Sequence, residues 1–125
     1  MQTCLIVDDS SVIRKVAARI IFQLGFTVEN AACGEEALQL IEKNGLPDVA
    51  IVAASLGDNQ GSDLIRQIRA LPGGAEPVVL ASLVEAGLGQ MTRLKRAGAT
   101  DFVYKPFNRE ALTGWLRPYL EAEAA

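Results

Sequence analysis

Apolar residues form two kinds of pattern along the chain, and the two kinds alternate. Short runs rich in Val, Ile and other strand-forming residues occur at 4–7, 26–31, 48–54, 77–81 and 101–104. After each run, apolar residues recur every three or four positions, which predicts helices over 10–24, 34–44, 64–71, 88–97 and 112–120. The alternation predicts an α/β fold, a single doubly wound, five-stranded parallel sheet flanked by five helices.

The polar content of each run indicates its place in the sheet. Residues 4–7 and 49–54 are apolar without a break, as expected of strands that are buried on both faces. In the run at 26–31, Thr27 and Glu29 flank Val28, which is typical of a strand near the edge of a sheet. We therefore expect the third strand at the centre of the sheet and the second strand near an edge.

The chain has 125 residues, of which 50% are hydrophobic, and a net charge of -3. This length predicts one domain, residues 1–125, with a frayed tail at 120–125. The negative charge offers nucleic acid or an anionic membrane no overall attraction, so we expect no direct contact with either. No apolar run reaches the ~18 residues of a membrane span, and the N-terminus lacks the features of a signal peptide, so a cytoplasmic location is expected.

Histidine is absent from the sequence. This excludes Ser-His-Asp and Cys-His catalysis, as well as metal sites built on histidine. Cys4 and Cys33 are too few for a cysteine zinc site, and we interpret each as a small buried residue. Any chemistry would have to use carboxylates, hydroxyl groups or Lys105.

Polar side chains follow three of the predicted strands. Asp8 and Asp9 follow the first, Ser82 lies after the fourth, and Lys105 follows the fifth. Because ligands bind beyond the carboxyl ends of parallel strands, where the strand order reverses, these side chains predict a site. Two adjacent carboxylates repel each other, so the pair implies a positive partner. A simpler interpretation is that Asp9 or Ser10 only caps the helix that follows.

Several short motifs, taken in order and with their spacing, resemble those of a response-regulator receiver domain over nearly the whole chain. The motifs are Leu5-Ile6-Val7-Asp8-Asp9-Ser10, Gly34-Glu35-Glu36-Ala37-Leu38, Pro47-Asp48-Val49, Gly61, Ser82, Ala97-Gly98-Ala99 and Lys105-Pro106-Phe107. The resemblance implies a flavodoxin-like fold with the strand order 2-1-3-4-5, as in chemotaxis receivers. It also implies a role in two-component or phosphorelay signalling.

The resemblance assigns roles to the residues at the strand ends. In receivers, an acid pair after the first strand helps to bind Mg²⁺, and the corresponding residues are Asp8 and Asp9, with Ser55 contributing its backbone. A hydroxyl group and a lysine contact the phosphoryl group in receivers, and the corresponding residues are Ser82 and Lys105. An Asp at the end of the third strand accepts the phosphoryl group from a sensor kinase.

This acceptor position is occupied by Ala53. Counting forward from residues 47–49 and backward from Gly61 gives the same position, and a methyl group cannot be phosphorylated. Asp58 is a possible substitute acceptor, but it lies about five residues past the strand end, at up to ~3.3 Å per residue. The loop also departs from the family at Gly57, where a Pro is frequent, and at Gln60.

We therefore interpret the chain as a stand-alone pseudo-receiver that acts through phosphorylation-independent protein contacts. It would not be an enzyme and would require no cofactor. Asp8 and Asp9 would hold Mg²⁺ weakly or not at all, with Lys105 as their counter-charge. One alternative is a genuine phosphoryl-accepting response regulator, seen as an Asp-to-Ala variant at residue 53 or using Asp58. Another is an anion site formed by Arg14, Arg66, Arg69, Arg93 and Arg96.

The expected partner is a signalling protein: a histidine kinase, a phosphotransferase or a downstream regulator. The expected contact face holds Arg93 and Arg96 on the predicted fourth helix, with Phe102 and Tyr104 on the fifth strand. Phe102 corresponds to the aromatic residue that changes rotamer in receivers. The helix over 10–24 is a second candidate surface, and the protein is expected to be a monomer or a weak homodimer.

Overall fold

The computed structural model describes the backbone of residues 2–57 and 59–124, and the side chains of these ranges as far as residue 119. The helices are α1 (Ser11–Gln23), α2 (Gly34–Asn44), α3 (Gly61–Ala70), α4 (Leu88–Ala97) and α5 (Arg109–Ala124). The strands are β1 (Thr3–Val7), β2 (Thr27–Ala31), β3 (Val49–Ala53), β4 (Ser55–Leu56), β5 (Asn59–Gln60), β6 (Val78–Leu83) and β7 (Asp101–Tyr104). Each predicted strand and helix is present, with ends displaced by a few residues.

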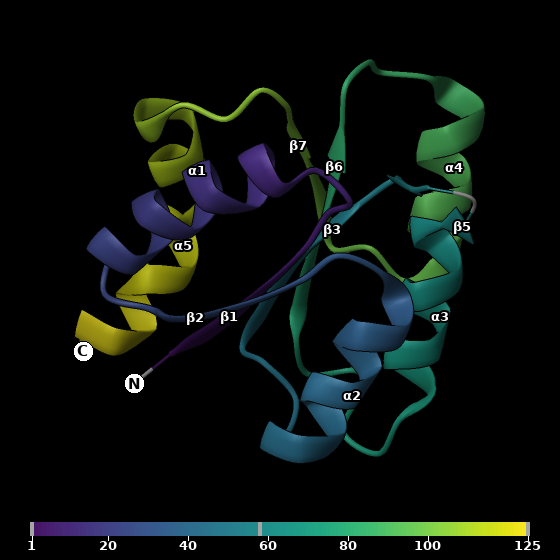
Figure 1. The fold of residues 1–125 in the computed structure, drawn as a ribbon, viewed down its shortest axis with the longest axis horizontal. Helices are drawn as coiled ribbons and strands as arrows, with labels where there is room; N and C mark the ends of the chain where they lie inside the picture. Colours follow the sequence, from purple (N-terminus) through teal and green to yellow (C-terminus); the bar gives the residue numbers. More distant parts are fainter. Residues whose placement is uncertain (1, 58, 125) are drawn as a thin grey trace.

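The main sheet has five parallel strands in the order β2-β1-β3-β6-β7 (Figure 1). This is the expected order 2-1-3-4-5, because β4 and β5 form a separate antiparallel pair in the segment that we expected to be a loop. As predicted, β3 lies at the centre and β2 at an edge. The fold class inferred from the sequence is therefore confirmed.

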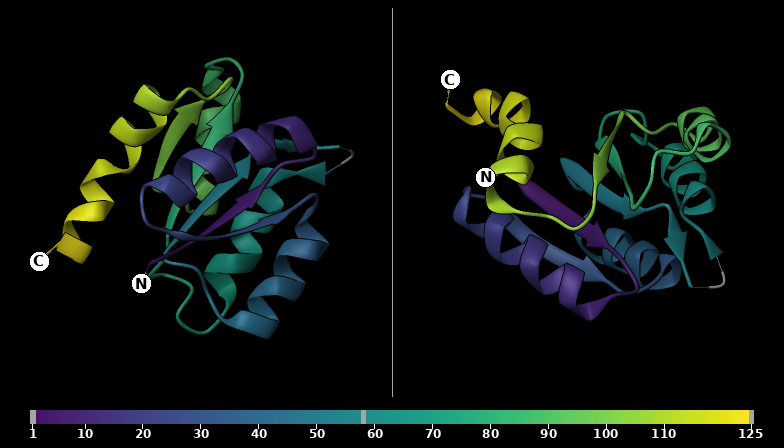
Figure 2. Two further views of the ribbon diagram at one scale, coloured as in Figure 1. Left: turned by 60° about the vertical axis from the view of Figure 1, so that its left-hand side comes forward. Right: turned by 90° about the horizontal axis from the view of Figure 1, so that it is seen from above.

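Two hydrophobic layers lie on opposite faces of the sheet. Along β1, Cys4 and Ile6 face one layer and Leu5 and Val7 face the other, because successive side chains of a strand alternate. Helices α1 and α5 cover the first face, and α2, α3 and α4 cover the second (Figure 2). A strand with helices on both faces has no solvent-facing side, which explains why the central runs contain no polar alternation.

The helix boundaries follow local rules of the sequence. Ser10 caps α1, since its Oγ accepts a hydrogen bond from the backbone N–H of Ile13 at 3.3 Å. Asn108 caps α5 in the same way, accepting from Ala111 at 2.8 Å. After α1, Gly25 has a φ of 103°, a left-handed conformation that suits glycine.

Helix α5 is described as far as Ala124. Residue 125 of the expected frayed tail at 120–125 lies outside the described residues, and the frayed tail stays a prediction. Among the helices of the described ranges, none is both long enough and apolar enough to cross a bilayer.

Candidate functional site

The ends of four strands bring the candidate residues to one edge of the sheet. Ala53, the last residue of β3, is paired in register with Ser82 of β6, and Ser82 is paired with Val103 of β7. Lys105 follows β7 directly, and its backbone N–H donates to the carbonyl of Leu83 at 2.8 Å. Because β1 lies on the other side of β3, Asp8 and Asp9 reach the same edge at the point where the strand order reverses.

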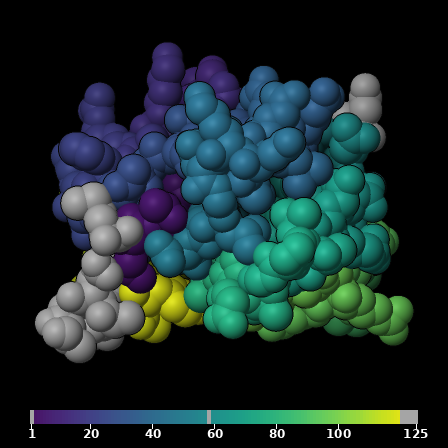
Figure 3. All heavy atoms as spheres, turned by 90° about the horizontal axis from the view of Figure 1, so that it is seen from below, coloured from purple at the N-terminus to yellow at the C-terminus, as the bar shows by residue number. Residues whose placement is uncertain are grey.

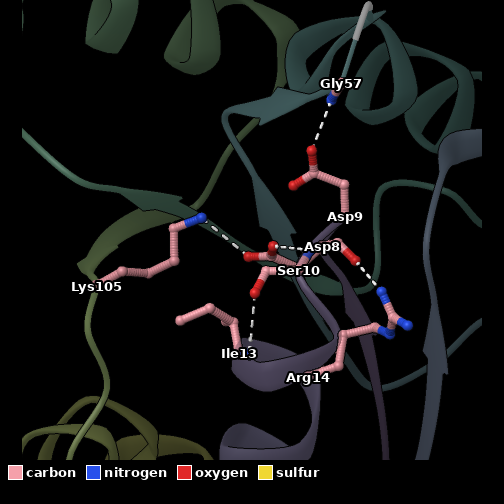
Figure 4. A network of polar contacts seen from close by, with 7 residues as sticks. All are labelled: Asp8, Asp9, Ser10, Ile13, Arg14, Gly57 and Lys105. Atoms are coloured by element: carbon pink, nitrogen blue, oxygen red, sulfur yellow. Dashed lines mark hydrogen bonds and ion pairs between the residues drawn. The ribbon is translucent and has the colours of Figure 1, made fainter.

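Asp8 is buried, and Figure 4 shows contacts of its carboxylate and of its backbone carbonyl. Its Oδ2 atom lies 2.9 Å from Nζ of Lys105, and its Oδ1 atom accepts a hydrogen bond from the backbone N–H of Ser10 at 2.9 Å. Its backbone carbonyl accepts from the Arg14 guanidinium at 2.7 Å. The prediction that Lys105 provides the counter-charge is confirmed for Asp8.

Asp9 is exposed and turns toward the loop after β3 instead. Its Oδ2 atom accepts a hydrogen bond from the backbone N–H of Gly57 at 3.1 Å (Figure 4). Gly57 has a φ of 63°, and a Pro at this position has neither that φ nor a backbone N–H. The departure from the family at residue 57 therefore supplies Asp9 with a hydrogen-bond donor from the chain itself. Sequence reasoning singled out Gly57 but did not predict this contact.

The helix-capping interpretation of this segment is correct for Ser10 and not for Asp9. Ser10 uses its side chain to cap α1, whereas the Asp9 side chain accepts from Gly57. One residue therefore caps α1, and the two carboxylates make other contacts. This division explains how an Asp-Asp-Ser sequence combines a polar site with a helix start.

Ala53 is completely buried and belongs to the apolar layer beneath α2, α3 and α4. Its carbonyl faces Gly61, where an added Cβ would lie 2.0 Å from the Ala53 oxygen. This close approach brings the end of β3 against the start of α3. Asp58, the alternative acceptor, lies outside the described residues.

A cavity of about 240 Å³ opens beside these strand ends. Its lining includes Ser55, Ser82 and Lys105, which the sequence predicted to lie together. Glu85 also lines it, and sequence reasoning missed this residue. Its position three residues after Ser82, in the segment between β6 and α4, was the available signal. The complete lining is Ala54, Ser55, Ser82, Val84, Glu85, Gln90 and Lys105.

The donor set fits Mg²⁺ poorly. Mg²⁺ requires near-octahedral oxygen coordination and is commonly held by carboxylates together with water. Here Asp8 is paired with Lys105, Asp9 accepts from Gly57, and the third carboxylate position is occupied by Ala53. Within the described ranges, no group of three acidic, Cys or His side chains is placed to hold a metal ion.

The residues expected on a contact face occupy neighbouring elements. Arg93 and Arg96 are exposed on α4. Phe102 of β7 is half-buried, and its ring centroid lies 5.8 Å from Nζ of Lys95 on α4. Tyr104 is partly exposed and contacts the ring of Trp115 on α5, with centroids 6.3 Å apart.

The anion site considered for five arginines does not assemble from the described contacts. Arg14 donates to Asp8, Arg66 lies beside Asp63, and Arg69 donates to backbone carbonyls near the opposite end of the sheet. Arg93 and Arg96 lie together on α4. Among the described contacts, neither makes one of the kind made by the other three arginines.

The family model of the response regulator receiver domain matches residues 4–117. The chain belongs to this family. Chemotaxis protein CheY1 of Helicobacter pylori is 28% identical over 109 residues, which cover 86% of this chain and 88% of CheY1. The protein named "Probable transcriptional regulator ycf27" of Guillardia theta is 32% identical over 116 residues, but they cover only 44% of its length and 93% of this chain.

Solved structures agree with this assignment. The structure of the Vibrio cholerae chemotaxis protein CheY4 has a TM-score of 0.89 and 30% sequence identity, covering 94% of this chain and 98% of that chain. The chain is thus a receiver domain of two-component signalling. Receiver domains are signalling proteins and not enzymes in the usual sense, and they interact with kinases and downstream effectors.

Proposed function

We propose that this receiver transmits its signal through protein contacts that do not depend on phosphorylation. The observation that carries the proposal is Ala53, which ends β3 where receivers have the acceptor Asp. Its methyl group is buried, and the cavity formed by Ser82 and Lys105 is not lined by it. Ser82 and Lys105 would then stabilise the fold at this edge and would not contact a phosphoryl group.

We also propose that these protein contacts do not require a divalent cation. The contacts of Asp8 with Lys105 and of Asp9 with Gly57 support it, because each carboxylate already has a donor within the chain. Removal of a third carboxylate takes away an attraction of about 4 kcal/mol for each unit of cation charge, at 4 Å and an effective dielectric constant of about 20, before desolvation is counted. At a site formed by Asp8, Asp9 and the Ser55 carbonyl, Mg²⁺ would bind only weakly.

The proposed partner is a protein of the same signalling system: a histidine kinase, a phosphotransferase or a downstream regulator. The proposed surface is the α4–β7 face, defined as Arg93, Arg96, Phe102 and Tyr104. Two exposed arginines on α4 and two aromatic side chains on β7 suit a protein interface, where Arg and Tyr are enriched. A cytoplasmic location, without direct contact with nucleic acid or membrane, is part of this proposal.

The second candidate is a phosphoryl-accepting regulator, with an Asp-to-Ala change at residue 53 or with Asp58 as acceptor. The retained Asp8, Ser82 and Lys105 favour it, since they are the other residues that phosphoryl transfer uses in receivers. The codon for residue 53 in the natural gene distinguishes an altered residue from a natural one. Mass spectrometry distinguishes a protein that is phosphorylated on Asp58 from one that has no acceptor.

The test is incubation with acetyl phosphate and Mg²⁺, followed by intact mass spectrometry. The protein is expected to remain unmodified, whereas the Ala53→Asp variant serves as the positive control for an acid-labile phosphoryl adduct. An adduct on the unchanged protein, mapped to Asp58 or elsewhere, would refute the proposal.

The contact face is tested separately by a pull-down from cell extract. Arg93→Glu/Arg96→Glu is expected to lose a specific partner that the unchanged protein retains. Lys43→Glu/Arg117→Glu is the control with the same change in charge, because both side chains are exposed and lie outside the proposed face. Equal retention by both variants would contradict the assignment of this face.

A further inference from the structure

The largest hollow described on the molecule is a groove between α2 and α3, of about 730 Å³. Figure 3 shows the two helices side by side on the face seen from below, in blue and teal. The floor of this α2–α3 groove is apolar, made by Leu38, Leu56 and Leu64. Its lining is completed by Gly34, Glu35, Gln39, Glu42, Asn59, Gln60, Asp63, Arg66 and Gln67.

The rim of the groove is acidic. Glu35 and Glu42 are exposed and lie seven residues apart, two helical turns, so they project from the same side of α2. Asp63 adds a third carboxylate from α3, and the lone basic residue in the lining, Arg66, lies 3.5 Å from it. The groove therefore combines an apolar floor with uncompensated negative charge on its α2 side.

One end of the groove is formed by the β4–β5 pair, which contributes Leu56, Asn59 and Gln60 to the lining. The Gly57 N–H joins this pair to Asp9, and Gly61 packs against the Ala53 carbonyl. A preformed groove loses less conformational entropy when it binds a helix.

The opposite side of the molecule presents the complementary chemistry. We define the α1 face as Val12, Lys15, Val16, Arg19 and Phe22. Val12, Val16 and Phe22 are 67%, 40% and 70% exposed, although each is a large apolar residue. At about 100° per residue the five side chains fall within an arc of roughly 120°. Helix α1 contains three basic residues and no acidic one, in a protein of net charge -3.

The two surfaces also match in length and position. Val12 to Phe22 spans about 15 Å of helix, and the α2 side of the groove, from Gly34 to Glu42, spans about 12 Å. The α1 face and the groove lie on opposite sides of the sheet, so they cannot meet within one chain (Figure 2). Each molecule can therefore use both surfaces at once.

We propose that the α1 face of one copy of this chain docks into the α2–α3 groove of a second copy. Val12, Val16 and Phe22 would cover the apolar floor, while Lys15 and Arg19 would lie against the acidic rim. Such a head-to-tail contact is heterologous and produces short open chains of molecules rather than a closed dimer. A single helix in a groove buries less surface than standard interfaces, so we expect a dissociation constant of about 0.1–1 mM.

The test is sedimentation velocity of the whole chain from low to millimolar concentration. The unchanged protein should show concentration-dependent growth in mass that weakens as salt rises, because opposite charges are screened. Lys15→Glu/Arg19→Glu and Glu35→Lys/Glu42→Lys should each weaken association at least about tenfold. The variant with all four changes has the original net charge and restores complementary charges, so it should associate again.

Matched controls separate this contact from general charge effects and from the proposed function. Glu76→Lys/Glu110→Lys changes the net charge as the groove variant does, and Arg93→Glu/Arg96→Glu changes it as the α1 variant does; both should still associate. Circular dichroism confirms that every variant is folded. A chain that stays monomeric at 1 mM, an association unaffected by the groove variant, or a fourfold variant that fails to associate would each overturn the proposal. None of these outcomes bears on phosphorylation or on the α4–β7 face.

Discussion

The ammonium group of Lys105 lies 2.9 Å from the Oδ2 atom of Asp8, although 97 residues separate the two in the sequence. The pair joins β1 to β7 across the centre of the sheet edge, because β3 and β6 lie between these strands. The Asp8 side chain is 3% exposed and that of Lys105 is 15% exposed. A carboxylate so deeply buried depends on its cation, and this dependence leads to the first prediction.

Lys105→Met should lower the free energy of unfolding by about 2–3 kcal/mol, because it leaves the Asp8 charge buried without a counter-ion. Urea denaturation measures the loss. The double variant Asp8→Asn/Lys105→Met should recover part of it, since both charges are then removed. Equal stability of Lys105→Met and the unchanged protein would show that the ion pair contributes nothing.

Mg²⁺ should stabilise the unchanged protein only slightly. If the dissociation constant exceeds about 10 mM, then 10 mM Mg²⁺ adds less than about 0.4 kcal/mol of stability. Ala53→Asp supplies the missing carboxylate and should respond more strongly in the same thermal melts. Tight, stoichiometric binding to the unchanged protein in a calorimetric titration would contradict the fit described for Asp8 and Asp9.

Arg69 connects the end of α3 to two loops. Its guanidinium donates to the carbonyls of Gly98, Gly74 and Pro77 at 2.7–2.9 Å, and to Thr100 Oγ1 at 3.3 Å. Burial lowers the pKa of Arg69, yet an arginine stays charged at neutral pH. Arg69→Ala should therefore lose about 2–3 kcal/mol of stability, since several buried acceptors lose their donor.

Arg66 is the matched control for this substitution, because it lies on the same helix and is exposed beside Asp63. Arg66→Ala should change the free energy of unfolding by no more than about 0.5 kcal/mol. Similar losses for Arg66→Ala and Arg69→Ala in urea denaturation would refute the role of the buried contacts.

Gly61→Ala should destabilise the protein strongly, by more than about 2 kcal/mol, because the new Cβ would lie 2.0 Å from the Ala53 carbonyl oxygen. Gly114→Ala is the control, since Gly114 lies within α5 with nothing within 4 Å of a new Cβ. It should stabilise the helix by about 0.5–1 kcal/mol. Thermal melts that rank these two variants in the opposite order would contradict the close approach.

Burial raises the pKa of the Cys4 thiol to about 12, whereas Cys33 is partly exposed. At pH 8–9, a thiol reagent should modify Cys33 in the folded protein and reach Cys4 only after unfolding. Because the thiol of the unfolded chain ionises near its ordinary pKa of 9.0 and the folded thiol does not, stability should fall as the pH rises from 9 toward 12.

The Cys4→Ala variant isolates this effect, since it removes the thiol and should flatten the decrease in stability above pH 9. Rapid modification of two thiols per folded chain would show that Cys4 is accessible.

The sequence was sufficient to predict the alternation of strands and helices, the edge position of β2, a cap at Ser10 and the absence of a carboxylate at residue 53. These features are local: they depend on the period of apolar residues, on the chemistry of one or two neighbouring side chains, or on the identity of a single residue. The order and spacing of the motifs are also sufficient to indicate the receiver family.

The donor that each acid uses depends on tertiary contacts. Lys105 pairs with Asp8 and not with Asp9, while the Gly57 N–H reaches Asp9 across 48 residues. Neither contact leaves a periodic signal, because each depends on loops that meet only after the sheet has formed. The same is true of the buried Arg69 hydrogen bonds and of the α2–α3 groove, since packing of distant elements fixes which polar groups are enclosed and which surfaces remain open.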